Sequence, residues 1–148
     1  KAIYSTLSGA PHFYRIQSEE DFDFYSGILA AKIGDCPLES KFSFEVLDSD
    51  FHLLYLADGE NFEWTPWYEE YGKQWYWNGP EIGQNFASNK VFKAGTYYIK
   101  VFNNTNTGQY VMAVGDIEKF SLTDIVGLIF SIGDIEDEFW DPNLCNSI

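Results

Sequence analysis

Basic residues are scarce in this sequence. Nine Lys and Arg residues stand against 23 Asp and Glu residues among 148, so the formal net charge is −14. Such a surface repels the phosphate backbone of nucleic acids and anionic lipid headgroups. We therefore expect no nucleic-acid partner. The charge is compatible with cation binding, but a solvated acidic surface is the simpler explanation.

Long hydrophobic runs and an initiator methionine are also missing. No stretch reaches the roughly 18 to 20 consecutive apolar residues that cross a bilayer, and Met112 is the only methionine. We expect a processed or excised part of a longer protein. Any signal peptide would then lie upstream, and any membrane anchor of the parent protein beyond Ile148.

Cysteine occurs only twice, at Cys36 and Cys145. The wide separation and the lack of a CxxC pair do not fit the spacing of metal ligands. In an exported domain the two could form a disulfide, whereas in a cytosolic protein they would be unrelated thiols. The polar tail around Cys145 favours the disulfide, because a free thiol has little packing role there. It thus favours an extracellular or cell-surface location.

The sequence has ample material for one hydrophobic core, since 45% of its residues are hydrophobic and 19% aromatic. Its length suits a single domain. In segment 94–115, apolar side chains recur with a period of two on both sides of the turn-forming run Asn103–Gly108. This pattern predicts a hairpin of two strands, whose buried faces carry Tyr97, Ile99 and Val101, then Tyr110, Met112 and Val114.

Further strands are predicted along the chain. After a polar lead-in they are expected at 11–17, 25–31, 42–47 and 51–57, and 91–93 leads into the hairpin. Residues 62–89 lose this regularity and are interpreted as a long aromatic insertion, a kind of loop that is usually functional. The fold class is therefore all-β. We predict an antiparallel, jelly-roll-like β-sandwich over residues 1–120.

The C-terminal part changes its period. Ser121 and Asp124 have the spacing of a capping box. From Leu122 onwards, apolar residues follow helical spacing at Leu122, Ile125, Val126, Ile129, Phe130 and Ile132. This predicts one helix and a tail over residues 121–148. The helix either packs on the sandwich or lies at a membrane or partner surface.

Three segments carry a recognisable motif: Asp50–Gly59 (DFHLLYLADG), Ala94–Val101 (AGTYYIKV) and Gly108–Val114 (GQYVMAV). Together they resemble the pre-peptidase C-terminal domains of bacteria and archaea. The resemblance covers roughly a third of the chain, and the aromatic insertion is longer than that family's loop. It implies a jelly-roll domain appended to an exported enzyme or surface protein. The chain is also similar to extracytoplasmic domains of membrane-anchored archaeal and bacterial proteins, which implies binding, adhesion or stabilisation at the cell surface.

The strongest candidate for a functional site is the stretch 64–77, which holds four of the five tryptophans. Planar rings stack on the apolar faces of sugars, and carboxylates such as Glu69 and Glu70 accept hydrogen bonds from sugar hydroxyls. In the opposing interpretation the tryptophans are core residues that brace a long loop. Both interpretations stay open here, and the second is the simpler. The candidate ligand-binding residues are Trp64, Trp67, Tyr68, Tyr71, Trp75 and Trp77.

Acidic turns offer a second candidate. Asp48, Asp50 and Asp58 could supply oxygen ligands to Ca²⁺, although they do not match the EF-hand pattern. Solvated turn carboxylates explain them more simply, and no cofactor is predicted.

Catalytic motifs are lacking, since the sequence contains no G-x-S-x-G, HExxH or phosphate loop. The only histidines are His12 and His52, both in predicted strands without a nucleophile nearby in sequence. We therefore predict a non-catalytic extracytoplasmic module that binds a glycan or a surface protein. The alternatives are a purely structural stalk or spacer, and a hydrolase that brings a histidine, an acid and a nucleophile together.

Overall fold

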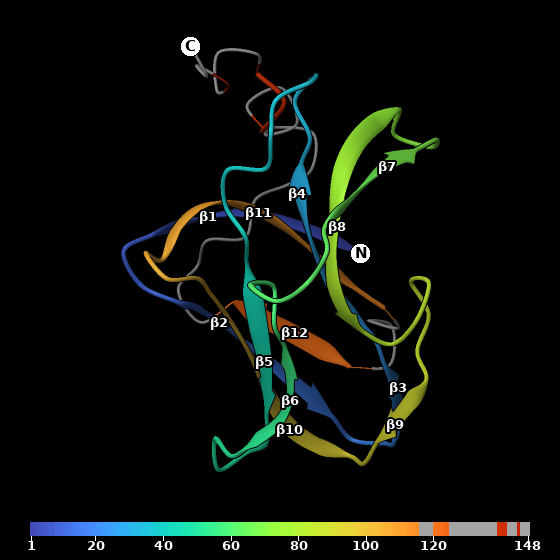
Figure 1. Cartoon of the computed structure of the whole chain (residues 1–148). Helices are drawn as coiled ribbons and strands as arrows, with labels where there is room; N and C mark the ends of the chain where they lie inside the picture. The colour runs from blue at the N-terminus through green and yellow to red at the C-terminus, as the bar shows by residue number, and fades with distance from the viewer. Residues whose placement is uncertain (116–119, 125–138, 142–144, 146–148) are drawn as a thin grey trace.

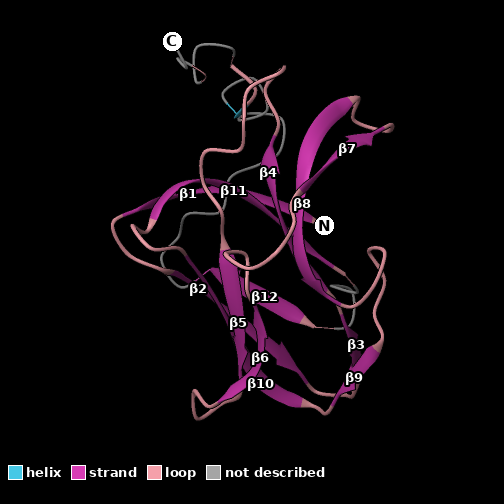
Figure 2. Ribbon diagram, viewed as in Figure 1, coloured by secondary structure: helices cyan, strands magenta, loops and turns pink. Residues whose placement is uncertain are grey.

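The computed structural model describes residues 1–115, 120–124, 139–141 and 145. This part of the chain folds almost entirely into strands joined by turns (Figure 2). Its strands are β1 (Ala2–Ser8), β2 (His12–Ser18), β3 (Phe22–Phe24), β4 (Ser26–Ala31), β5 (Ser43–Leu47), β6 (Leu53–Ala57), β7 (Thr65–Glu69), β8 (Gln74–Ile82), β9 (Lys90–Phe92), β10 (Gly95–Phe102), β11 (Thr107–Val114) and β12 (Ser121–Asp124).

Two antiparallel sheets face each other across the core (Figure 1). Sheet A has the strand order β1-β11-β4-β8-β7, and sheet B has the order β12-β2-β10-β5-β6. A small third sheet pairs β3 with β9. This arrangement confirms the predicted all-β sandwich.

The connection between β10 and β11 crosses from sheet B to sheet A. β10 pairs with β2 and β5, whereas β11 pairs with β1 and β4. The two strands predicted over 94–115 are therefore confirmed, but the direct pairing within one hairpin is wrong. β1, which the sequence pattern missed, crosses to β2 in the same way. The ribbon β1–β2 thus lies alongside the ribbon β10–β11 across both sheets, as in a jelly roll.

The inner faces of both sheets supply one main core. Ile99 and Val101 of β10 and Tyr110 and Met112 of β11 are completely buried there. They occupy the positions that the alternation assigned to the inner face. Tyr97 is partly buried and packs at the margin of this core.

The segment 62–89 is more regular than its sequence suggests. β7 and β8 form a true hairpin that extends sheet A from β4 (Figure 1). The proline and glycine residues of this segment are compatible with the hairpin. Pro66 lies on the edge strand, where a missing N–H is tolerated. Gly79 and Pro80 lie where the register between β4 and β8 shifts, which is the signature of a β-bulge. The prediction of an irregular insertion was therefore wrong for β7 and β8.

The predicted C-terminal helix is wrong at its start. Ser121–Asp124 forms β12, which pairs with β2 at the edge of sheet B, and Leu122 packs against the core. Four residues with mixed polarity fit a strand as well as a helix turn, so the capping-box spacing was a coincidence. Positions 125–132 of the predicted helix lie outside the described residues.

The two cysteines are joined in a disulfide, with their Cα atoms 6.1 Å apart. Cys36 lies in the connection between β4 and β5, so the bond ties the C-terminal part of the chain to the sandwich. Nearby in sequence, Phe139 and Trp140 pack on the outer face of sheet A against Tyr4 and Tyr76. The helices of the described residues include none that is long and apolar enough to cross a membrane.

Candidate functional site

The aromatic side chains of the β7–β8 hairpin divide between its two faces. Successive residues of a strand point to opposite faces, and directly paired residues share a face. Tyr68 is paired with Trp75, whereas Trp67 is paired with Tyr76. One aromatic stretch of sequence therefore gives two separate surfaces.

The first surface continues the inner face of sheet A beyond the sandwich. We call Tyr68, Trp75 and Trp77 the aromatic platform. The rings of Tyr68 and Trp75 are 5.2 Å apart between centroids and tilted by 54°. They are 39% and 47% exposed, whereas Trp77 is half-buried at the margin of the core. The platform is thus two exposed rings side by side with a third, better anchored ring next to them.

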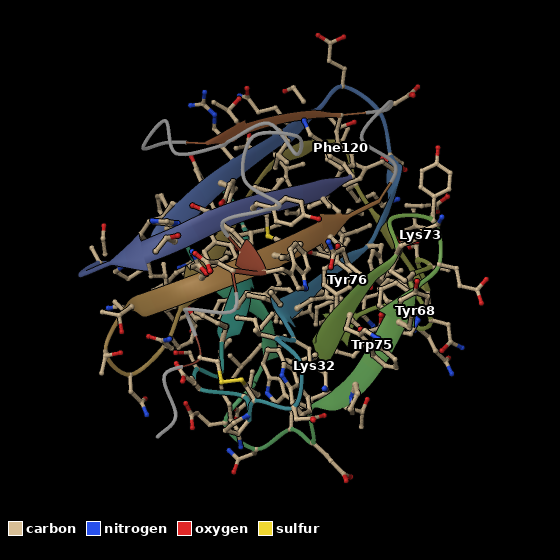
Figure 3. The ribbon with its side chains drawn as sticks, turned by 90° about the horizontal axis from the view of Figure 1, so that it is seen from above. Lys32, Tyr68, Lys73, Trp75, Tyr76 and Phe120 are labelled. Atoms are coloured by element: carbon tan, nitrogen blue, oxygen red, sulfur yellow. A yellow bond between two sulfur atoms is a disulfide. The ribbon has the colours of Figure 1, made fainter. Side chains whose placement is uncertain are left out.

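Lys32 adds a positive charge to this platform. Its Nζ atom lies 5.8 Å from the Trp75 ring centroid and 5.5 Å from that of Trp77, within the range of a cation–π contact. Figure 3 shows Lys32, Trp75 and Tyr68 following one another along the hairpin. Lys32 follows β4, so sequence proximity gave no signal that it would join aromatic residues more than forty positions further on.

The second surface is a groove on the outer face of sheet A. Its volume is about 530 Å³, and its lining includes Trp67, Tyr71, Tyr76, Tyr4 and Phe86. The Tyr4 and Tyr76 hydroxyls form a buried hydrogen bond of 2.8 Å. Trp67 packs against Phe86 with ring centroids 4.8 Å apart. No pattern in the sequence predicts that Tyr4 or Phe86 lies beside the tryptophan-rich stretch.

Two carboxylates shape the turns beside these surfaces. Glu69 accepts hydrogen bonds from the backbone N–H groups of Tyr71 and Gly72, so it closes the β7–β8 turn. Glu81 accepts hydrogen bonds from the Tyr25 hydroxyl at 2.6 Å and from the N–H groups of Asn85 and Phe86. Burial, together with the hydrogen bond to Glu81, raises the pKa of Tyr25 well above its ordinary value. Both carboxylates therefore position the backbone.

Three of the predicted ligand-binding residues lie away from the platform. Trp67 lines the groove on the outer face. Trp64 is 8% exposed and donates its indole N–H to the Gly59 carbonyl at 2.9 Å, so it belongs to the core. Tyr71 is 98% exposed at the hairpin turn and borders the groove. The core interpretation is thus right for Trp64, whereas Trp75 and Tyr68 are exposed.

The acidic residues predicted for Ca²⁺ divide into two places. Asp48 and Asp50 lie with His52, their ligand atoms within 4.8 Å of one another, whereas Asp58 lies beyond the other end of β6. Asp48 accepts hydrogen bonds from the N–H groups of Asp50 and His52. Asp58 accepts hydrogen bonds from Glu60 and Asn61. Closing these two turns accounts for the positions of Asp48 and Asp58.

The two histidines have different environments. His12 is buried, and its Nδ1 atom lies 2.8 Å from the Tyr110 hydroxyl and 3.4 Å from Ser5 Oγ. Ser5 is also completely buried, so this serine–histidine pair is closed to substrate. His52 is exposed, and its nearest charged partner is Asp48 at 3.6 Å. Among the described residues, the histidine that contacts a serine is thus the buried His12, whereas the exposed His52 contacts a carboxylate.

Comparison of this chain with protein-family models, with curated proteins and with solved structures finds no match.

Proposed function

We propose that this protein is a non-catalytic, extracytoplasmic β-sandwich that binds a glycan on the aromatic platform. The observation that carries the proposal is the exposure of Tyr68 and Trp75 as neighbouring rings on a paired hairpin. Tryptophan is highly buried on average in folded proteins, so a Trp75 ring that is 47% exposed is unusual. Rings held open to water present flat apolar faces, which stack on the C–H faces of sugar rings.

The arrangement of the platform supports a rigid, ring-shaped ligand. Cross-strand pairing holds Tyr68 and Trp75, and both have few rotatable bonds, so little conformational entropy is lost on binding. Their tilt of 54° suits successive sugar units of a twisted chain better than one extended flat ligand. Lys32 provides a hydrogen-bond donor beside the rings, which sugar hydroxyls can use.

An extracytoplasmic location is supported by the Cys36–Cys145 disulfide, because such bonds persist in oxidising compartments. The similarity of the sequence to pre-peptidase C-terminal domains points the same way. It suggests a domain appended to an exported or membrane-anchored parent protein, where glycans and surface proteins are the available partners.

A glycan titration tests the proposal. The intrinsic tryptophan fluorescence of the full chain is followed across a panel of soluble oligosaccharides, and the best ligand is then titrated into variants. Trp75→Ala and Tyr68→Ala should each weaken binding at least about tenfold, the loss expected for a central aromatic contact. Tyr71→Ala is the matched control, because it removes an exposed ring that is outside the platform.

The result also separates the alternative functions. Weaker binding in Tyr71→Ala together with unchanged binding in Trp75→Ala would move the glycan site to the outer groove, which Tyr71 borders. A panel without any spectral change or binding, together with an unchanged fold in Trp75→Ala, would leave the stalk or spacer as the better explanation.

A further inference from the structure

The second large exposed apolar feature is β6, the edge strand of sheet B. Its sequence is LLYLA, and Leu53, Leu54 and Leu56 are 54%, 41% and 49% exposed. Pairing with Glu45 places Leu56 on the outer face of the sheet, while Tyr55, opposite Val46, packs against the core. Leu54 is the extra residue where the register of β6 against β5 shifts. Three leucines exposed within four residues far exceed the scattered apolar residues of an ordinary surface.

The backbone of β6 also has an open side. Among the described residues, Leu53–Ala57 pairs only with β5. Alternate N–H and C=O groups of an edge strand point away from its sheet and can pair with an added strand. Proteins usually protect such an edge with proline or lysine. β7, the edge strand of sheet A, carries Pro66, but β6 carries neither residue. Its irregularity is the register shift at Leu54, so the regular part of the open edge is Tyr55–Ala57.

Negative charge lies at both ends of this strand. Asp48 and Asp50 precede it, Asp58 and Glu60 follow it, and the segment 48–60 contains no Lys or Arg. Two cations beside this strand are already engaged: Lys90 lies 4.8 Å over the Tyr55 ring, and Lys100 lies 3.8 Å from Glu45. The edge is therefore an apolar strip between two acidic ends.

This charge pattern argues against a second copy of the chain as the occupant. In a two-fold antiparallel pairing centred on Tyr55, Asp50 of one copy would lie opposite Glu60 of the other. Like charges directly opposite each other destabilise strand pairing. The net charge of −14 on each copy adds a longer-range repulsion.

We propose that β6 receives an added antiparallel strand from a partner protein, an extended segment with apolar residues in its middle and basic residues at both ends. Backbone hydrogen bonds along the open edge supply affinity, and contacts with Leu54 and Leu56 together with charge pairing at the ends select the segment. This surface is separate from the aromatic platform, which lies at the edge of the opposite sheet.

Three synthetic peptides test the proposal on the full chain. The first, KKVTVTVKK, has the proposed chemistry. The second, EEVTVTVEE, reverses the charge, and the third, KKVTPTVKK, keeps the charge but places a proline where pairing is needed. Calorimetry gives the affinities, and amide hydrogen exchange locates the site. We expect only the first peptide to slow exchange along β6, by about tenfold or more near saturation.

Two variants make the test specific for β6. Leu56→Lys should weaken binding of the first peptide at least about tenfold, since it removes an apolar contact and adds a like charge. Tyr71→Lys is the matched control, because Tyr71 is 98% exposed at the β7–β8 turn of the opposite sheet, and its binding should match wild type. Both substituted side chains are exposed, so both variants should fold.

Three outcomes would overturn the proposal. Equal binding of the proline peptide would mean that charge alone attracts it, and equal binding of the acidic peptide would remove the charge selection. A dimer in sedimentation that Leu56→Lys abolishes and the first peptide cannot displace would identify a second copy as the occupant. None of these results depends on whether the platform binds a glycan.

Discussion

The hairpins β5–β6 and β7–β8 occupy equivalent places at the edges of the two sheets but expose different chemistry. Each ends its sheet with a five-residue strand, and each leaves large apolar side chains in water. In β7–β8 these side chains are tyrosine and tryptophan, and Pro66 interrupts the open edge. In β5–β6 they are leucines, and the edge carries no proline, although the register of β6 against β5 shifts at Leu54.

This difference separates two ways of using an exposed apolar surface. Aromatic rings offer flat faces of fixed orientation, so the side chains themselves can select a rigid ligand. Leucine side chains lack that shape, so recognition at β6 has to come mainly from the backbone edge. The same physical property, apolar area left in water, therefore predicts a side-chain site on one hairpin and a main-chain site on the other.

The largest effect is expected where the two hairpins meet. The Trp64 ring packs close to Gly59, just after β6, and to Gly79 in the middle of β8, and it is buried. Trp64→Ala leaves a cavity between them and should lower the free energy of unfolding by about 3–5 kcal/mol. Chemical denaturation followed by circular dichroism measures this loss.

Trp75→Ala is the control from the same stretch of sequence. Its ring is 47% exposed, so its removal should change the free energy of unfolding by no more than about 1 kcal/mol. Similar losses for the two variants would contradict the division into a core tryptophan and a binding tryptophan.

Sequence periodicity predicted the faces of the strands well but their partners poorly. Alternation placed Ile99 and Val101 in the core, where they are completely buried. It could not show that β10 and β11 lie in different sheets, because a short polar connection fits a hairpin and a crossing between sheets equally well. β12 was mistaken for a helix start because Ser121–Asp124 is too short to reveal its period.

The candidate site was predicted only in part for a related reason. The cluster of aromatic residues was visible in the sequence, but the face of each ring depends on the register of β7 against β8. Trp64 and Trp75 look alike in sequence, although one is core and the other is exposed. Lys32 joins the platform through the pairing of β4 with β8, a contact without any local signal.

The second largest effect is expected from removal of the disulfide, which should destabilise β7–β8 more than β5–β6. The double variant Cys36→Ser/Cys145→Ser should lower the free energy of unfolding by about 2–4 kcal/mol, because the bond closes a long loop. Local stability should fall mainly in β7–β8. The disulfide holds the C-terminal part of the chain, in which Trp140 donates its indole N–H to the Trp75 carbonyl at 2.8 Å. Hydrogen exchange resolved by residue should accelerate more at Gln74–Tyr76 than at Phe44–Val46. Equal acceleration in both hairpins would show that the disulfide acts on the whole sandwich.

Substitution of Glu81, whose carboxylate stabilises the turn beside the groove, should have a smaller effect on the free energy of unfolding. Glu81→Gln removes the charge that accepts hydrogen bonds from Tyr25, Asn85 and Phe86, and should cost about 1–2 kcal/mol. The pKa of Tyr25 should fall towards 10.0, its ordinary value, but stay above it because burial remains. An alkaline titration of tyrosine absorbance measures this shift.

The sign of the pH effect follows from the raised pKa of Tyr25. The folded state holds this proton more tightly than the unfolded state, so the contribution to stability is complete below about pH 10 and is lost as the pH rises further. Wild type should therefore lose stability in alkali more steeply than Glu81→Gln. Parallel alkaline profiles would show that Glu81 does not stabilise the protonated hydroxyl.

The smallest effect concerns the turn that ends β6 and leads towards β7. The side chain of Asn61 donates a hydrogen bond of 2.6 Å to Asp58, and with the Glu60 N–H it lowers the pKa of Asp58 below 3.8, its ordinary value. Asn61→Ala should move the pKa of Asp58 back towards that value, as measured by an NMR titration of its carboxylate. Because the pKa is lowered in the folded state, the turn's contribution to stability is present above about pH 4 and is lost as the pH falls through the folded-state pKa. Unchanged titration in the variant would assign the lowered pKa to the backbone N–H groups of Glu60 and Asn61. The acidic end of β6 would then keep its charge down to low pH without help from the Asn61 side chain, and binding of the basic peptide should persist to the same low pH in both proteins.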